Sequence, residues 1–212
     1  MLDIFSRNWI LILSFTLTVI LAVAVQMELL HSFDQWGVEF FRDTANPENA
    51  LGGESIKILI MWLTHTGDSK FLAVISIIVS FGLYRKYGRQ YAARAIAAFF
   101  GSFFLTAVLK AAFGRLRPDI VPQFVEATSA SFPSGHTLRS TVVYFLVAFF
   151  FLEGQYTNTS RRIVVALAGI MIIVNGLSRV YLGVHWPTDV FTGWLMGVCW
   201  VLICIKYLNA EK

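Results

Sequence analysis

The chain has 212 residues, of which 57% are hydrophobic, 15% aromatic and 14% charged, and its mean hydropathy is +0.66. Soluble globular domains carry about a quarter charged residues, so this composition excludes that class, along with disordered and collagen-like chains. The formal net charge of +4 is small, and the basic residues fall between apolar blocks, so we expect no nucleic-acid partner. These values favour one membrane-embedded domain over residues 1–212, because the length hardly allows a second.

Six uncharged runs predict an all-α, polytopic membrane protein with six transmembrane helices, since a spanning helix needs about 20 mostly apolar residues. The runs cover residues 8–27, 71–84, 95–109, 140–152, 163–178 and 190–205. The first is long enough alone, and we expect an uncleaved helix there because its apolar stretch exceeds a usual signal-peptide core. The other five need polar flanking residues to cross a membrane, and the limits of the second are the hardest to place.

A polar stretch, residues 28–70, separates the first two spans. Its apolar residues cluster at 33–41 and 56–63, which indicates short helices lying at the membrane interface. Lys and Arg fall almost evenly on the two sides of the predicted bundle, while the acidic residues concentrate in the connections on one side. We therefore expect both termini to face the cytoplasm and the stretch 28–70 to face outward.

Three polar stretches follow the third span, precede the fourth and join the fifth to the sixth. They contain Lys110 and Arg117, then Ser134, Gly135 and His136, then Arg179, His185 and Asp189. Alternating crossings put all three stretches on one membrane face, where they can converge. Lys110, Arg117 and Arg179 would repel one another at a low-dielectric boundary unless they bound an anion such as phosphate. Arg115 and Arg139 add further positive charge nearby.

The same stretches carry groups suited to phosphoryl transfer. Ser134 and Gly135 lead into a helix, whose free N–H groups favour an anion. His185 and Asp189 lie four residues apart on one helix face, so the carboxylate can hold one imidazole nitrogen while the other attacks phosphorus. His136 can protonate the leaving oxygen. We expect no metal ion, because the neighbouring cations would repel it and no zinc-motif spacing is present.

Together the three stretches resemble the type-2 phosphatidic acid phosphatase family, which includes glucose-6-phosphatase and vanadium haloperoxidase relatives. The family's first signature, Lys, six residues and Arg-Pro, matches residues 110–118, and its second, Pro-Ser-Gly-His, matches residues 133–136. The third, Ser-Arg, five residues, His, three residues and Asp, matches residues 178–189. The resemblance implies six transmembrane helices around the helical core of the acid phosphatase and haloperoxidase group, with no cofactor.

The resemblance also implies a role for each motif residue. His185 is the expected nucleophile, which forms a phosphohistidine, Asp189 orients it, and His136 protonates the leaving group and then activates water. The expected phosphate-binding residues are Lys110, Arg117, Ser134, Gly135 and Arg179. Small bacterial members act on undecaprenyl diphosphate, phosphatidylglycerophosphate, phosphatidic acid or lipid A at the outer face of the inner membrane. We therefore expect a lipid phosphate or diphosphate as the substrate.

Two other functions are compatible with the sequence. A phosphotransferase would use the same phosphohistidine but pass the group to a second lipid, and the motifs do not define the acceptor. A non-catalytic phospholipid carrier would explain the cations, but it gives no reason for the pairing of His185 with Asp189. The sequence predicts no particular oligomeric state.

Overall fold

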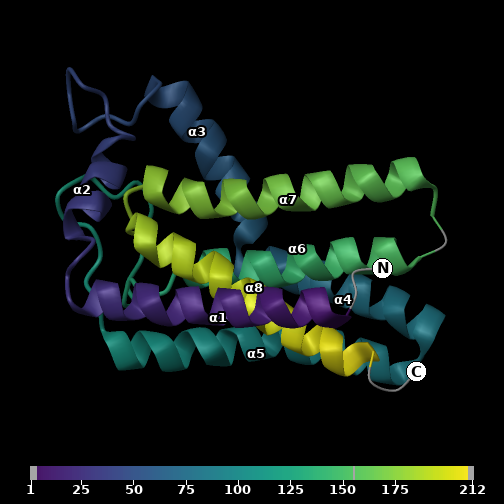
Figure 1. Cartoon of the computed structure of the whole chain (residues 1–212). Coiled ribbons are helices and arrows are strands. Elements are labelled where there is room, and N and C mark those ends of the chain that lie inside the picture. The colour runs from purple at the N-terminus through teal and green to yellow at the C-terminus, as the bar shows by residue number, and fades with distance from the viewer. Residues whose placement is uncertain (1–3, 155, 210–212) are drawn as a thin grey trace.

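The structure is a computed structural model that describes residues 4–154 and 156–209. Its long helices run side by side, and α1 (Ile4–Gln26) begins at the same end of the bundle at which α8 (Pro187–Asn209) ends (Figure 1). At the opposite end, α2 (His31–Glu39) lies across the bundle (Figure 1). Within the described residues, β-structure is confined to one isolated two-residue bridge. The fold is therefore all-α, as predicted.

Each of the six predicted spans is a helix. Besides α1 and α8, these helices are α4 (Ser69–Tyr87), α5 (Arg89–Phe113), α6 (Gly135–Glu153) and α7 (Asn158–Tyr181). The last five spans extend beyond their uncharged runs at both ends, so the expected recruitment of polar flanks is confirmed. Among the described residues, five of the six helices, all except α4, are individually long and apolar enough to cross a membrane.

The second span is a broken helix. α3 (Gly53–Thr64) and a 3-10 turn at His65–Gly67 run into α4, and the two parts together have the length and hydropathy of a span, with a bend of 46° between them. The stretch 56–63 lies in α3, a short helix separate from α4 as predicted, and its place at the membrane interface stays a prediction. The other predicted interfacial segment forms α2, whose aromatic side chains are largely exposed.

The helix ends that carry the polar stretches are set by local sequence. α5 ends at Gly114, whose positive φ of 56° turns the chain and lets its N–H bond the Lys110 carbonyl. α6 begins after Ser134, whose Oγ accepts a hydrogen bond from the Thr137 N–H at 3.4 Å. α8 begins at Pro187, which suits a first helical position because proline lacks an N–H.

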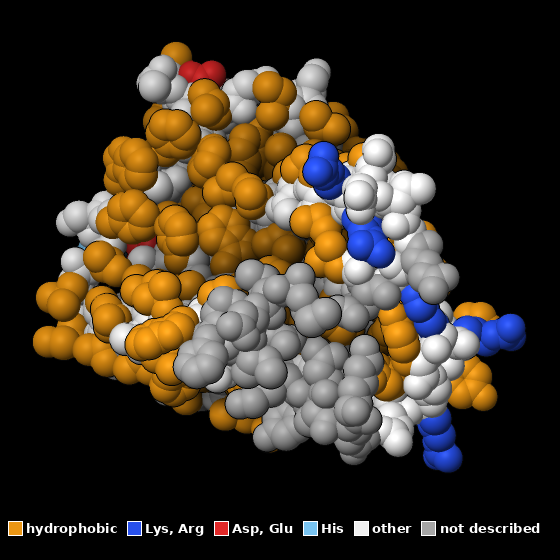
Figure 2. All heavy atoms as spheres, turned by 45° about the vertical axis from the view of Figure 1, so that its right-hand side comes forward, with side chains coloured by type: hydrophobic (Ala, Val, Ile, Leu, Met, Phe, Trp, Pro, Cys, Tyr) orange, Lys and Arg blue, Asp and Glu red, His pale blue; other side chains and the backbone are white. Residues whose placement is uncertain are grey.

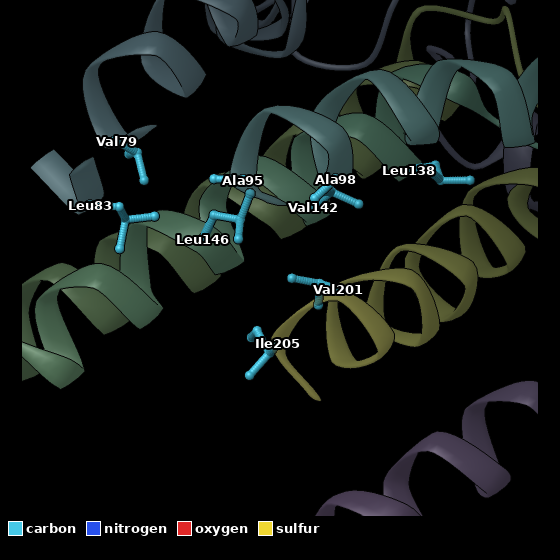
Figure 3. Close-up of a cluster of buried hydrophobic side chains, with 9 residues drawn as sticks. All are labelled: Val79, Leu83, Ala95, Ala98, Leu138, Val142, Leu146, Val201 and Ile205. Atoms are coloured by element: carbon cyan, nitrogen blue, oxygen red, sulfur yellow. The ribbon is translucent and has the colours of Figure 1, made fainter. Parts of the chain in front are cut away.

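α6 is the central helix and packs against α4, α5, α7 and α8. One cluster of buried apolar side chains joins four of these helices (Figure 3). Its members are Val79 and Leu83 of α4, Ala95 and Ala98 of α5, Leu138, Val142 and Leu146 of α6, and Val201 and Ile205 of α8. This packing fixes α5, α6 and α8 relative to one another, and with them the polar stretches at their ends.

Apolar side chains cover much of the flank of the bundle that Figure 2 shows, and Lys and Arg side chains gather at one side of that view. Large apolar side chains are exposed along the helices, for example Trp9 on α1 at 68% and Phe104 on α5 at 74%. A surface of this kind is suited to lipid rather than to water. Basic residues of the α4–α5 turn and of the start of α7 lie at the end where α1 begins. The cytoplasmic orientation of that end stays a prediction.

Candidate active site

The three polar stretches meet at one cavity of about 280 Å³. Its lining contains Lys110, Arg117, Gly135, His136, Arg179 and His185, together with Phe103, Thr106, Ala107, Ser129 and Arg139. Six of the eight residues predicted for the site therefore share one cavity. The other two, Ser134 and Asp189, are fully buried, Ser134 next to Gly135 and Asp189 behind His185.

His185 is held as a neutral imidazole. Its Nδ1 lies 3.3 Å from Asp189 Oδ2, and its Nε2 lies 3.3 Å from Nη1 of Arg117. The carboxylate can only accept, so this contact assigns the proton to Nδ1 and leaves the Nε2 lone pair on the side of the cavity cations. Burial lowers the pKa of His185 to about 3, against the opposing effect of Asp189 and with added lowering from Arg117 and Arg179.

Asp189 accepts from four donors, although its side chain is completely buried. Besides His185, these are Ser131 Oγ at 2.5 Å, the Trp186 N–H at 2.9 Å and Arg115 Nη1 at 2.7 Å. Trp186 directly precedes α8, and Asp189 is the third residue of that helix. The bond from the Trp186 N–H to Asp189 is therefore one half of a capping box. The carboxylate therefore has a fixed orientation before any ligand binds.

Arg115 does not face the cavity, which corrects its assignment to the anion-binding cations. Its Nη2 binds Asp34 Oδ2 at 2.6 Å, so its guanidinium bridges Asp34 and Asp189. Asp34, on α2, is fully buried and also accepts from Thr188 N at 2.9 Å and Thr188 Oγ1 at 2.7 Å. It thereby caps the first turn of α8 from a distant part of the chain.

Sequence reasoning missed Asp34 and Ser131. The sequence does hold a signal for Asp34, because it is an acid within the apolar stretch 33–41, and the structure shows it buried beside Gly37 and Val38, where an acid needs a partner. Ser131 lies three residues before Ser134, and its full burial is visible in the structure alone.

His136 lies against the bend between α3 and α4. Its Nε2 lies 2.7 Å from the Thr64 carbonyl oxygen, which can only accept, so Nε2 carries a proton. Its Nδ1 is then free to exchange a proton with a ligand, and it lies 4.0 Å from Asp68 Oδ1. Thr64 Oγ1 also contacts Ser178 Oγ at 3.0 Å and Arg179 Nη1 at 3.2 Å.

The cations of the cavity are held by oxygen atoms of loops. Lys110 Nζ donates to the Ala130 carbonyl and to Ser129 Oγ, and Arg117 Nε donates to the Ser129 carbonyl at 2.8 Å. Among the described residues, no carboxylate forms an ion pair with Lys110, Arg117 or Arg179. Their positive charge is therefore available to an anionic ligand.

In the described part of the chain, no three His, Cys, Asp or Glu side chains gather in a way that could hold a metal ion. The independence from metal ions stays a prediction.

Comparisons with known proteins agree with this geometry. Residues 91–212 match the PAP2 superfamily. The chain is 36% identical to phosphatidylglycerophosphatase B of Bacillus subtilis over 138 residues, covering 64% of this chain and 67% of that protein. It is 30% identical to an undecaprenyl-diphosphatase of Sulfolobus acidocaldarius over 199 residues, covering 89% and 85%.

A solved structure, the transmembrane PAP2 type phosphatidylglycerolphosphate phosphatase from Bacillus subtilis, superimposes with a TM-score of 0.82. It shares 27% sequence identity, and the match covers 95% of this chain and 97% of that one. The family match spans more than half of the chain and includes every predicted site residue. The chain therefore belongs to the PAP2 superfamily, and it is an integral membrane hydrolase of the lipid phosphatase kind.

Proposed function

We propose that the protein removes a phosphoryl group from a membrane lipid through a phosphohistidine at Nε2 of His185, without a metal ion. The observation that carries this proposal is the state of His185. The imidazole is buried and neutral, Asp189 fixes its Nδ1, and its unprotonated Nε2 lies beside Arg117 in a cavity whose cations have no carboxylate partner among the described residues. A non-catalytic carrier would have no use for a nucleophile prepared in this way.

In the first step, the Nε2 lone pair of His185 forms a bond to phosphorus as the bond from phosphorus to the lipid oxygen breaks. Binding of the phosphate anion favours an imidazolium at His136, whose Nδ1 proton passes to that oxygen, while Nε2 keeps its proton and its hydrogen bond to the Thr64 carbonyl. Asp189 stabilises the positive charge that develops on the His185 ring. General acid catalysis of this kind contributes typically 10²–10⁴-fold.

The charge of the transition state is spread over the phosphoryl oxygens. Lys110, Arg117 and Arg179 can donate to these oxygens, and so can the backbone N–H groups where α6 begins at Gly135. In the second step, His136 Nδ1 takes a proton from water as the water oxygen bonds to phosphorus and the bond to His185 breaks. Phosphate leaves, and His136 is again protonated.

The substrate class follows from the position of the cavity. It lies where helices of the bundle end, below polar loops, so a lipid head group can enter while its chains stay beside the apolar flank. The relatives named above act on phosphatidylglycerophosphate and undecaprenyl diphosphate, which supports a lipid phosphate or diphosphate here. They are hydrolases, and no feature of the cavity favours a phosphotransferase. We place the site at the outer face of a bacterial inner membrane, with cytoplasmic termini.

The test is phosphate release by purified protein in detergent, with His185→Ala as the main variant. We expect no release from any lipid phosphate by this variant, whereas wild type should accumulate a base-stable, acid-labile phosphohistidine during turnover. His31→Ala is the matched control, because His31 is exposed and lies outside the cavity, and it should keep activity within about threefold. Release by His185→Ala at the wild-type rate would refute the assigned nucleophile.

A further inference from the structure

The cavity holds a fourth cation that lies outside the three motifs. Arg139 follows Gly135 by one turn of α6, and its guanidinium lies over that glycine, so that a Cβ there would meet Nη1 at 2.8 Å. The guanidinium also stacks over the ring of Phe103 on α5, with 4.6 Å from Cζ to the ring centroid. Arg139 is thus fixed at the wall of the cavity that α5 and α6 share.

Arg139 has donors that the protein does not use. Its Nε is buried without a hydrogen-bond partner, and in the described part of the chain no carboxylate forms an ion pair with it. Asp68 is the acid whose charge acts on Arg139, but its carboxylate is half exposed and binds His65 Nδ1 at 2.7 Å. A buried guanidinium with free donors is costly unless a ligand supplies acceptors.

Arg139 lies next to the phosphoryl site on the Phe103 side, because its guanidinium covers Gly135, where the N–H groups that would bind the phosphoryl oxygens begin. The cavity runs along α5 from Lys110 to Phe103, a distance of about 10 Å at 1.5 Å per residue. Lys110 and Arg117 lie at one end of the cavity, where both bind Ser129. Arg139 lies at the other end, over Phe103, which is nearer the middle of α5. Because the Phe103 end lies toward the apolar middle of the spanning helix α5, the lipid chains are expected on that side.

The charge of the cavity also favours a substrate with a second phosphate. Lys110, Arg117 and Arg179 carry one positive charge more than a transferred phosphoryl group of charge about −2 can balance, and Arg139 raises this excess to two. A substrate with one phosphate leaves that charge unmatched. A substrate with a second phosphate between the scissile bond and the lipid chains places an anion beside Arg139.

We propose that Arg139 binds a second phosphate group of the substrate, on the lipid side of the bond that breaks. This inference rests on the proposed function and narrows its substrate class to lipids with two phosphates. Two chemistries present such a group, an isoprenoid-type diphosphate, with directly bonded phosphates, and a diacyl lipid in which a phosphodiester precedes a terminal phosphate. Phosphatidic acid and isoprenoid monophosphates lack it.

The experiment compares kcat/KM within two matched pairs, farnesyl diphosphate against farnesyl monophosphate and phosphatidylglycerol phosphate against phosphatidic acid. In Arg139→Gln, we expect kcat/KM to fall about 10- to 100-fold for the two-phosphate member of one pair, because one charge-assisted interaction is lost. The monophosphate should change by less than about threefold, which also shows that the variant is folded. Arg139→Lys should recover part of the loss, and Arg162→Gln, exposed near the start of α7, should match wild type.

The pair whose selectivity collapses identifies the source of the second phosphate. An equal loss on all four substrates, or no loss on any, would overturn the role of Arg139. Binding gives a reading that does not need turnover, since in the His185→Ala background Arg139→Gln should weaken binding of farnesyl diphosphate but not of farnesyl monophosphate. Absence of phosphate release by wild type on every substrate would instead contradict the proposed function.

Discussion

Replacing Asp34 with asparagine would disconnect α2 from the His185–Asp189 pair while keeping the size of the side chain. The carboxylate accepts from Arg115 Nη2 and from both Thr188 N and Thr188 Oγ1, and it is fully buried. Asparagine retains one acceptor oxygen, so it can still cap Thr188 N. Its amide N–H₂ would then face the Arg115 guanidinium, donor against donor.

The expected size of the effect comes from the partners that remain. Removing one member of a buried ion pair costs about 3–5 kcal/mol, but Arg115 keeps Asp189 and its side chain is 17% exposed, so we expect a loss of stability of about 2–3 kcal/mol. The first turn of α8 carries Asp189 and begins two residues after His185. Since a displacement of about 1 Å in a reacting group can cost about 100-fold, we expect kcat to fall about 10- to 100-fold. KM should change little, because Asp34 does not line the cavity.

The assay measures kcat and KM for phosphate release, and thermal unfolding of the same preparation in detergent. Glu39→Gln is the matched control, because it makes the same acid-to-amide change at an exposed position of α2, and it should resemble wild type in both measurements. A kcat within twofold of wild type for Asp34→Asn, at any melting temperature, would show that Asp34 serves the fold alone and would refute the reasoning.

Three further outcomes are expected. Gly67→Ala should reduce phosphate release more than tenfold, because a Cβ there would overlap Asn175 Oδ1 and the His136 ring. Gly169→Ala is the control, because no atom lies within 4 Å of a Cβ there, and its activity should equal that of wild type. Equal activities of the two variants would contradict this reasoning. The pKa of His185 is lowered to about 3 in the folded protein, so as the pH falls the unfolded chain binds this proton before the folded one does. The free energy of unfolding is therefore unaffected by His185 above pH 6.5 and is smaller by about 2–3 kcal/mol at pH 4.5. Thermal unfolding should show a smaller acid shift in His185→Gln than in wild type, and an undiminished shift would count against a neutral buried imidazole. Chelation with EDTA should leave phosphate release unchanged, and a loss that added metal restores would contradict a metal-independent mechanism.

The helices and the meeting of the three motifs follow from patterns that act along the chain. Long uncharged runs must be helical in a membrane, because every backbone group needs a partner there. Consecutive crossings alternate direction, so stretches after the third, before the fourth and after the fifth span share one face. Lys110, His136 and His185 could therefore be assigned to one cavity before any coordinates were known, and the structure places them there.

The sequence assigned Arg117 and Arg179 to phosphate through the motifs, but it did not distinguish the roles of Arg115 and Arg139. Arg115, Arg117 and Arg139 are alike in type and all lie near the motifs, yet Arg115 binds two carboxylates and the other two line the cavity. What separates them is a partner elsewhere in the chain: Asp34, which caps α8, is 154 residues from Thr188. Hydrogen bonds across such separations depend on packing, and hydropathy carries no information about them.

The broken second span connects these observations. Its uncharged run is short because Asp68 and Lys70 precede it, and residues just before them contact the site: the Thr64 carbonyl accepts from His136, and the Gly67 backbone lies against the same ring. Non-helical backbone at membrane depth is tolerated only where protein buries it or a watered cavity solvates it. At the bend the Asp68 N–H bonds the His65 carbonyl, so the Thr64 carbonyl is released from the helix ladder and accepts from His136 Nε2. The bend between α3 and α4 makes this span the hardest to define by hydropathy. The same bend supplies the Thr64 carbonyl that holds the Nε2 proton of His136, so Nδ1 is the nitrogen that exchanges a proton with the ligand.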